Sequence, residues 1–330
     1  MEHWQWRATV KSAVRQVLTH RSLGTVWRTF APTTVFFSHR YVAPGASGEL
    51  NDPKVLKPLL ERLRRERFTF PRLDQIVGCV ADSQPLPRRA VAFTVDDGYR
   101  DFEEIAPVYA AYDVPVTVFV STGFLDGACW MWWDRIAYAT RHSACHELHI
   151  ELDGEALRYQ WTDVGGAHAA ATDFVERLQW VPRDVREART TEAFERLGVT
   201  PPDKAPEEYA AMSWDDVRSY AKMGIKFGPH TVTHPILAET PAEDSAWEIE
   251  ESWRRLKEET DETVSVFCYP HGGPRAFGPR EAETVRRLGM LGAVSTGHRH
   301  PNPSGDAFAV PRYPCPDRGD RLLLMAYGIQ

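Results

Sequence analysis

Short hydrophobic runs alternate along the chain with longer segments in which apolar residues recur at helical spacing. The hydrophobic runs predict buried β-strands at residues 33–38, 90–95, 116–120, 225–227, 264–268 and 291–294. The helical patterns cover residues 55–65, 99–112, 240–260 and 279–288. Thr240 is the expected N-cap of the third helix, and Glu243 would complete a capping box. Repeated strand–helix units favour a mainly parallel sheet with right-handed crossovers, in which chemistry gathers at the carboxyl ends of the strands.

Residues 124–212 interrupt this alternation. The stretch opens with a tryptophan-rich segment, continues with a hairpin-like segment and ends in mostly helical sequence. We interpret it as an insertion between two strands, after which a helix cap at Ser213 restores the alternation. The predicted parts of the chain are an N-terminal helical segment (1–32), a main domain (33–123 and 213–318), the insertion (124–212) and a C-terminal helix (319–330).

The composition is that of an ordinary globular protein. Of the 330 residues, 43% are hydrophobic and 26% are charged, which excludes a disordered or fibrous chain. The net charge of −7 argues against a nucleic-acid partner. The five cysteines are scattered and form no Cys-x-x-Cys pair, so they predict neither a disulfide framework nor a zinc ribbon.

The N-terminus bears on where the protein acts. No hydrophobic run reaches the ~18 residues that would span a membrane, and no apolar stretch is typical of a signal peptide. We therefore expect a cytoplasmic protein without a transmembrane segment. Residues 1–32 mix basic residues with tryptophans. This segment is expected either to pack on the domain as a helix or to contact an anionic inner membrane surface peripherally.

Two adjacent carboxylates follow the strand predicted at 90–95. They belong to the segment Thr-Val-Asp-Asp-Gly, as Asp96 and Asp97. Such a pair is costly after a buried strand unless it binds something, because each charge raises the pKa of the other. The alternative is a turn in which an aspartate side chain caps the helix that follows.

Two further motifs follow later strands. His230 and His234, in Gly-Pro-His-Thr-Val-Thr-His-Pro, have a spacing that metal-binding histidines use, although both could instead be satisfied by nearby backbone groups. The flanking prolines disfavour a long helix there. The third motif, Phe-Cys-Tyr-Pro-His-Gly-Gly-Pro at 267–274, is a turn that could aim an N–H group at an oxyanion.

In this order, the three motifs resemble those of the polysaccharide deacetylase family, the carbohydrate esterases with a NodB homology domain. His39-Arg40 after the first strand and Val-Pro-Arg-Tyr at 310–313 fit the same pattern. The resemblance implies an α/β fold, a distorted (β/α) barrel that usually has seven strands, here with a mostly helical insertion. It also implies one divalent metal held by Asp97, His230 and His234, with Asp96 as general base. Zinc suits these ligands best, with cobalt, nickel and iron as alternatives.

The implied activity is hydrolysis of an N-acyl group, most often acetyl, from an amino sugar in a saccharide, a glycolipid or a nucleotide sugar. Water activated by the metal would attack the amide carbonyl, Asp96 would take its proton, and the backbone N–H of His271 would help to hold the oxyanion. A deformylase or another linear amide hydrolase could use the same chemistry. A non-catalytic saccharide-binding barrel is the alternative outside enzymes.

Two of the departures from the family pattern bear on the partner of the base and on the general acid. Many members have an arginine, paired with the base, where this chain has Cys268, so we expect Arg312 to orient Asp96 instead. The C-terminus lacks the Leu-x-x-His that usually supplies the acid histidine. The candidates for the general acid are His271, His298 and His300, and for each of them an ordinary loop histidine is the alternative.

Three residues are candidates for contact with the substrate. His39 follows the first strand, Tyr269 belongs to the third motif, and Trp133 ends the tryptophan-rich segment beside the site. An aromatic face suits the C–H-rich face of a sugar ring. For Trp130, Trp132 and Trp133 together, their helical spacing makes a place in the core the alternative. The expected partner is therefore a glycan.

Overall fold

The computed structural model describes residues 31–40, 52–316 and 318–329. Nearly all of the predicted N-terminal helical segment, with its predicted membrane contact, lies outside these residues. Within them, seven strands form the centre of the molecule. They are β1 (Thr33–Ser38), β2 (Ala90–Val95), β3 (Val116–Val120), β6 (Lys226–Pro229), β7 (Val266–Cys268), β8 (Gly292–Thr296) and β9 (Val310–Pro314). Their residues are almost all buried, as expected when helices cover a parallel sheet.

The strands run in the order β6-β3-β2-β1-β9-β8-β7, and every ladder between them is parallel. The two outermost strands approach each other through the segment before β7. There the N–H of Phe227 donates to the carbonyl of Glu262 (3.0 Å), and the N–H of Val264 donates to the carbonyl of Phe227 (2.8 Å). The sheet is therefore a nearly closed barrel, which confirms the predicted seven-stranded (β/α) architecture.

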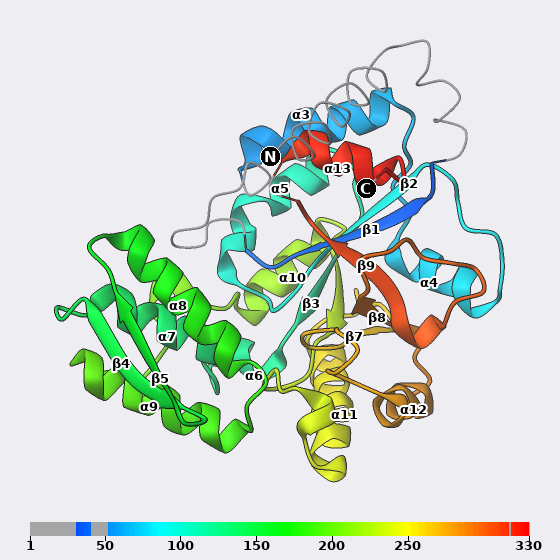
Figure 1. Cartoon of the computed structure of the whole chain (residues 1–330). Helices are drawn as coiled ribbons and strands as arrows, with labels where there is room; N and C mark the ends of the chain where they lie inside the picture. The colour runs from blue at the N-terminus through cyan, green and yellow to red at the C-terminus, as the bar shows by residue number, and fades with distance from the viewer. Residues whose placement is uncertain (1–30, 41–51, 317, 330) are drawn as a thin grey trace, which may run out of the picture.

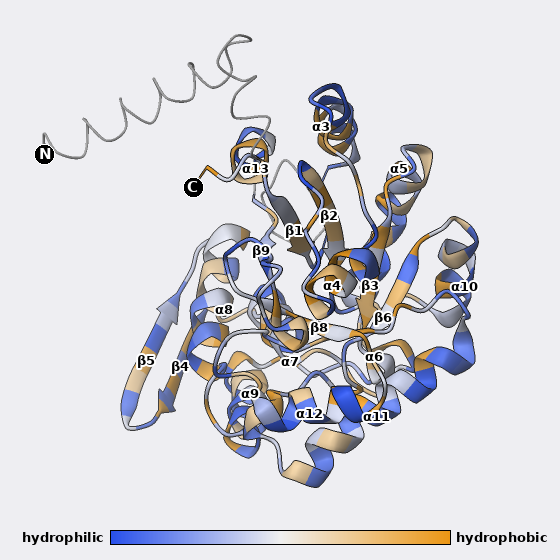
Figure 2. Cartoon of the chain, turned by 90° about the vertical axis from the view of Figure 1, so that its right-hand side faces the viewer, coloured by the Kyte–Doolittle hydropathy of each residue, from blue (hydrophilic) through white to orange (hydrophobic). Residues whose placement is uncertain are grey.

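Helices surround this barrel (Figure 1). They are α3 (Pro53–Arg65), α4 (Leu73–Ala81), α5 (Ala106–Ala111), α6 (Thr122–Leu125), α10 (Trp214–Lys222), α11 (Ala242–Glu259), α12 (Pro279–Arg287) and α13 (Gly319–Ala326). Several carry hydrophobic residues on one side and hydrophilic residues on the other (Figure 2). On α11 the buried stripe includes Ile249, Trp253 and Leu256, as their spacing predicts. No helix in the described ranges combines the length and the apolar character needed to cross a membrane.

The insertion packs around a core of its own. Its elements are α7 (Trp132–His142), β4 (Glu147–Leu152), β5 (Glu155–Gln160), α8 (Val164–Leu178) and α9 (Arg183–Leu197). Leu148, Trp161 and Phe174 are among the residues of this core. The two strands form the predicted hairpin, whose turn has positive φ at Asp153 (52°) and Gly154 (81°). In Figure 1 these elements lie together, in green, at one side of the barrel.

Several elements differ from the prediction. β9 is absent from it, because its five residues include Pro311 and Pro314, which weaken the pattern of a strand. The helix expected at 99–112 is divided into a 3₁₀ turn, η2 (Arg100–Glu104), and α5. The capping box expected at Thr240 is wrong. Pro241 is the N-cap of α11, and the hydroxyl of Thr240 donates to the carbonyl of Ile236 (2.9 Å). The cap at Ser213 forms with Asp216.

Candidate metal centre and active site

Asp96 and Asp97 follow β2 in a tight three-residue turn. The N–H of Gly98 donates to the carbonyl of Asp96 (3.0 Å), and φ of Asp97 is +76°. Gly98 has φ of +92°, a conformation in which any other side chain would be strained, and a Cβ atom there would also crowd Leu125 Cδ1 at 2.9 Å. Left-handed backbone at a residue other than glycine is costly and tends to persist where function requires it. The turn directs two neighbouring carboxylates into one buried site.

Asp97, His230 and His234 meet at this site, as the ligand set implied by the resemblance requires. Oδ1 of Asp97 lies 3.4 Å from Nε2 of His230 and 3.3 Å from Nε2 of His234, and all three side chains are buried. In the described part of the chain, this Oδ1 accepts no hydrogen bond. Ligand atoms about 2.1 Å from one ion in a tetrahedral arrangement lie roughly 3.4 Å apart, so the spacing fits a divalent metal.

The contact of Nδ1 determines the tautomer of the His230 ring. Nδ1 lies 2.8 Å from the carbonyl of Cys268, to which it donates, so a neutral ring presents the lone pair of Nε2 to Asp97. Two acceptors would then face each other, which is favourable only with a positive charge between them.

The pKa values of Asp97 and His230 also indicate that a positive charge between these groups is favourable. Burial alone would raise the pKa of Asp97, but its contacts with His230 and His234 hold that pKa well below its usual value. Burial alone would lower the pKa of His230, yet Cys268 and Asp97 raise it well above its usual value. Burial lowers the pKa of His234. A divalent metal would supply the charge that these groups favour.

Glu248 on α11 holds the loop that carries His234. Its carboxylate accepts hydrogen bonds from the backbone N–H groups of Val232 (2.7 Å) and Thr233 (2.9 Å), and from the Thr233 hydroxyl (2.5 Å). Glu248 is buried on the apolar side of α11. Sequence reasoning missed this residue, although a glutamate beside Ile249 on an apolar stripe is a signal that could have identified it.

We expect Glu248→Gln to weaken metal binding about 10–100-fold, the usual effect of losing a partner that orients a metal ligand. A glutamine amide would place an N–H group against two N–H donors and would free the loop. The measurement is the zinc dissociation constant by competition with a chelating dye. Glu250→Gln, at an exposed ion pair on the same helix, is the control. Equal affinities in the two variants would contradict this role for Glu248.

Asp96 is paired with Arg312 on β9. The guanidinium donates from Nη1 to Oδ1 and from Nη2 to Oδ2, both at 2.8 Å, and Arg312 is fully buried. Nη1 also donates to the hydroxyl of Thr94 (2.8 Å). Burial alone would raise the pKa of Asp96, but Arg312 lowers it below its usual value. The carboxylate is therefore ionised and held in one orientation.

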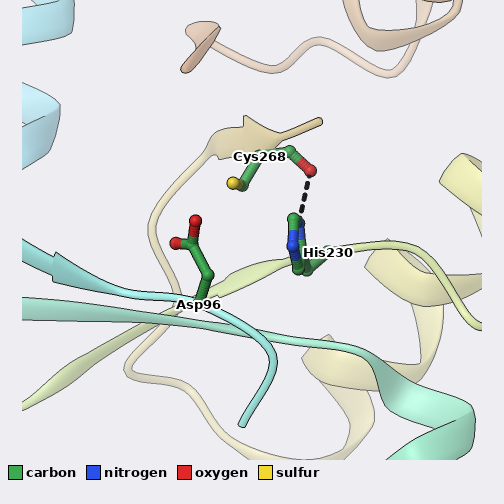
Figure 3. A group of neighbouring side chains, drawn as sticks. All are labelled: Asp96, His230 and Cys268. Carbon is green, nitrogen blue, oxygen red and sulfur yellow. Dashed lines mark hydrogen bonds between the residues drawn. The ribbon is translucent and has the colours of Figure 1, made fainter. Parts of the chain in front are cut away.

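Asp96, His230 and Cys268 form a second group with metal-binding side chains (Figure 3). The carbonyl of Cys268 accepts from His230, while its sulfur lies 3.1 Å from Nη2 of Arg312. Because the guanidinium already places a positive charge between the sulfur and Asp96, a second cation there would be repelled. Of the two groups, the one that contains Asp97 is therefore the better candidate for a metal site.

His271 follows β7 in a second three-residue turn. The N–H of Gly272 donates to the carbonyl of Pro270 (2.7 Å), and φ of His271 is +60°. The ring of His271 lies 5.1 Å from that of His234, and its Nδ1 lies 3.1 Å from the amide nitrogen of Gln179 on the insertion. Burial, together with the nearby His234 and Arg186, holds the pKa of His271 well below its usual value. This residue links the barrel, the metal centre and the insertion.

A cavity of about 570 Å³ is lined by the candidate metal ligands and by most of the other predicted site residues. His39 and His298 border it and are exposed. Trp133 borders it too, with its ring 4.9 Å from that of His234. Trp132 also borders the cavity but is largely buried in the core of the insertion. The predicted residues that meet at this cavity therefore come from both the barrel and the insertion.

Two predicted residues lie differently from the expectation. Nδ1 of His300 is 3.1 Å from the hydroxyl of Thr34, near the amino end of β1 and away from the cavity. The chain must return to that end between the parallel strands β8 and β9, so His300 cannot reach the substrate. Tyr269 borders the cavity, but its ring is 1% exposed and stacks on Phe277 at 3.8 Å, which leaves little of it for a sugar.

Sequence reasoning did not identify one wall of the cavity. The indole N–H of Trp133 donates to the Tyr99 hydroxyl (2.9 Å), which donates to Asp134 (2.7 Å). The guanidinium of Arg40 lies over the ring of Tyr99 (4.4 Å) and donates to Asp101 (2.9 Å). Burial raises the pKa of Asp134 to about 7, against the opposing effect of Arg40. This network fixes Trp133 beside His234.

Comparisons with known proteins agree with this fold. The chain is similar to the deacetylase PplD of Streptococcus pyogenes in complex with acetate (15% identity, TM-score 0.57, covering 90% of this chain and 97% of that one). It is also similar to IcaB from Ammonifex degensii (17%, 0.57, 90% and 97%). A third structure is a de-N-acetylase from Aggregatibacter actinomycetemcomitans (15%, 0.51, 87% and 95%). At these identities the likeness concerns the fold.

The sequence itself matches the polysaccharide deacetylase family. The family model covers residues 203–291, which include His230, His234 and Cys268. No curated protein matches the chain. Asp96 and Asp97 lie outside the matched range, but the barrel brings them to the two histidines. Residues 203–291 of the chain therefore match the polysaccharide deacetylase family, and the fold is similar to that of solved deacetylases.

Proposed function

We propose that this protein removes the N-acetyl group from an amino sugar within a glycan, with a divalent metal, most suitably zinc, at Asp97, His230 and His234. The observation that carries the proposal is the pairing of this ligand set with a buried, ionised Asp96 at the same cavity. One carboxylate and two imidazoles leave coordination positions open, as in catalytic metal sites.

The residues around the metal have distinct tasks in this proposal. A bound divalent ion would act as a Lewis acid on the amide carbonyl and would lower the pKa of a nearby water. Asp96 accepts a proton from the attacking water, and Arg312 keeps its carboxylate in position. The backbone N–H of His271 donates to no other group among the described residues, so it is available to an oxyanion.

A proton donor for the leaving amine is also required. His271 and His298 border the cavity and are the two candidates. The acetyl group is favoured because two proteins of similar fold are a deacetylase with bound acetate and a de-N-acetylase.

The proposal is tested by measuring acetate released from soluble N-acetylglucosamine oligomers by the zinc- or cobalt-loaded protein. The wild type should release acetate, and Asp96→Asn should do so about 10²–10⁴-fold more slowly, the usual contribution of a general base. Asp203→Asn, at an exposed site outside the cavity, should behave as wild type. Absence of acetate with every oligomer and both metals would refute the deacetylase assignment, and release of formate from N-formyl substrates alone would identify a deformylase.

A further inference from the structure

The insertion helix α8 forms one wall of the cavity that contains the metal centre. Six residues of the segment 168–179 border the cavity, spaced so that they share one side of the helix: His168, Ala171, Thr172, Val175, Glu176 and Gln179. The opposite wall consists of residues at or just after the carboxyl ends of the strands, among them His39, His298 and Pro314. The cavity is thus a cleft between the barrel and the insertion.

The wall is fixed at both ends. At the start of α8, the carboxylate of Asp163 accepts a hydrogen bond from the N–H of Gly166 (2.7 Å). Just after its end, Gln179 contacts His271, and the guanidinium of Arg275 lies 4.6 Å from the ring centre of Trp180. The opposite side of α8 packs into the insertion core through residues such as Phe174 and Leu178. A wall held in this way is preorganised, so binding of a ligand costs less ordering of the protein.

The length of the wall exceeds what one sugar needs. The eleven residue steps from His168 to Gln179 correspond to about 16 Å of helix, which is longer than a single hexose ring. Gln179, at one end, lies beside His271 and the metal centre, whereas His168, Thr172 and Glu176 continue the wall away from it. These three side chains are exposed and offer an imidazole, a hydroxyl and a carboxylate to a ligand rich in hydroxyl groups.

The charges along the cleft select between classes of substrate. Among the described residues that border it, Arg40 is the one arginine or lysine, and its charge is already paired with Asp101. Glu176 on α8 adds a negative group to this wall. A nucleotide sugar carries a diphosphate, which this wall would repel, whereas a neutral oligosaccharide meets no such cost.

We propose that α8 is the specificity wall of an extended cleft, in which His168, Thr172 and Glu176 bind sugar units adjacent to the one whose acetyl group is removed. This inference rests on the proposed function for the identity of the reacting sugar. It selects an oligomeric or polymeric glycan over a nucleotide sugar or a free monosaccharide.

Binding measurements test the inference without turnover. In an Asp96→Asn background, the affinities of N-acetylglucosamine, its tetramer and UDP-N-acetylglucosamine are measured by calorimetry. The tetramer should bind at least tenfold more tightly than the monomer. The nucleotide sugar should bind no more tightly than the monomer. His168→Ala/Thr172→Ala/Glu176→Ala should lose most of the tetramer's advantage. His149→Ala/Thr191→Ala/Glu195→Ala, at exposed positions of the insertion outside the cavity, should retain it.

The outcomes separate this inference from the proposed activity. A tetramer that binds no better than the monomer, a preference for the nucleotide sugar, or equal behaviour of the two triple variants would overturn the cleft assignment, even if the wild type releases acetate. A length-dependent affinity that only the first triple variant loses would support the cleft, even if no oligomer is hydrolysed.

Discussion

Asp97→Asn is expected to weaken metal binding by more than about a hundredfold, beyond the effect of losing a residue that merely orients a ligand. The same change should lower kcat/KM about a thousandfold, because a metal contributes several kcal/mol of charge stabilisation to the transition state. Asparagine has the shape of aspartate and tolerates the positive φ of this position, so the turn should persist. The measurements are metal content by elemental mass spectrometry and acetate release.

His230→Ala should give the same result, since it removes a second ligand from another strand end. Asp203→Asn serves as the control for the loss of a negative charge at the surface. Normal metal content in both Asp97→Asn and His230→Ala, with each protein folded by circular dichroism, would show that the metal binds elsewhere.

The second large effect is expected at Arg312. Its removal leaves the buried carboxylate of Asp96 without a compensating charge, and breaking a buried ion pair in this way costs about 3–5 kcal/mol. We expect Arg312→Met to lower the free energy of unfolding in urea by about this amount and to reduce kcat more than it raises KM. The double variant Arg312→Met/Asp96→Asn should be more stable than Arg312→Met, because the unpaired charge is gone.

Moving the arginine from position 312 to position 268 tests whether Arg312 orients Asp96 or contributes only to stability. The sulfur of Cys268 lies 3.1 Å from Nη2 of Arg312, so a guanidinium attached at position 268 would enter the same space. Cys268→Arg/Arg312→Met should recover a substantial part of the kcat that Arg312→Met loses, and Cys268→Ser/Arg312→Met should recover none. If kcat in Arg312→Met stays at the wild-type value while stability falls, Arg312 is not needed to orient Asp96.

The sequence predicts the uninterrupted hydrophobic strands of the barrel better than it predicts the strand that contains prolines. The bounds predicted for β1, β2 and β3 agree with the structure, because each is an uninterrupted hydrophobic run. β9 was missed since two of its five residues are prolines, yet it carries Arg312. The pairing of Arg312 with Asp96 was expected because Cys268 stands where many family members have the arginine, and it depends on β1 separating β9 from β2 in the sheet.

Other parts of the site depend on contacts that no local pattern records. Glu248 acts on a loop 15 to 16 positions away. The raised pKa of Asp134 follows from its burial between the barrel and the insertion. His300 was placed wrongly because its distance from the strand end in sequence is short, while the chain has already turned back. The motifs therefore pointed to candidate ligands that the fold brings together, whereas three-dimensional packing determines their surroundings.

The separate core of the insertion has a consequence for how such a protein can change. The candidate metal ligands all come from the barrel, whereas α8 and its supporting core come from one continuous segment. That segment leaves the barrel after α6 and rejoins it where Ala211 pairs with Tyr99. We expect that this segment can be exchanged for one of different shape while Asp96 and the candidate metal ligands keep their places, provided that the contacts of Trp133 and Gln179 are retained. The same barrel would then be retargeted to another glycan by recombination at two points of the chain.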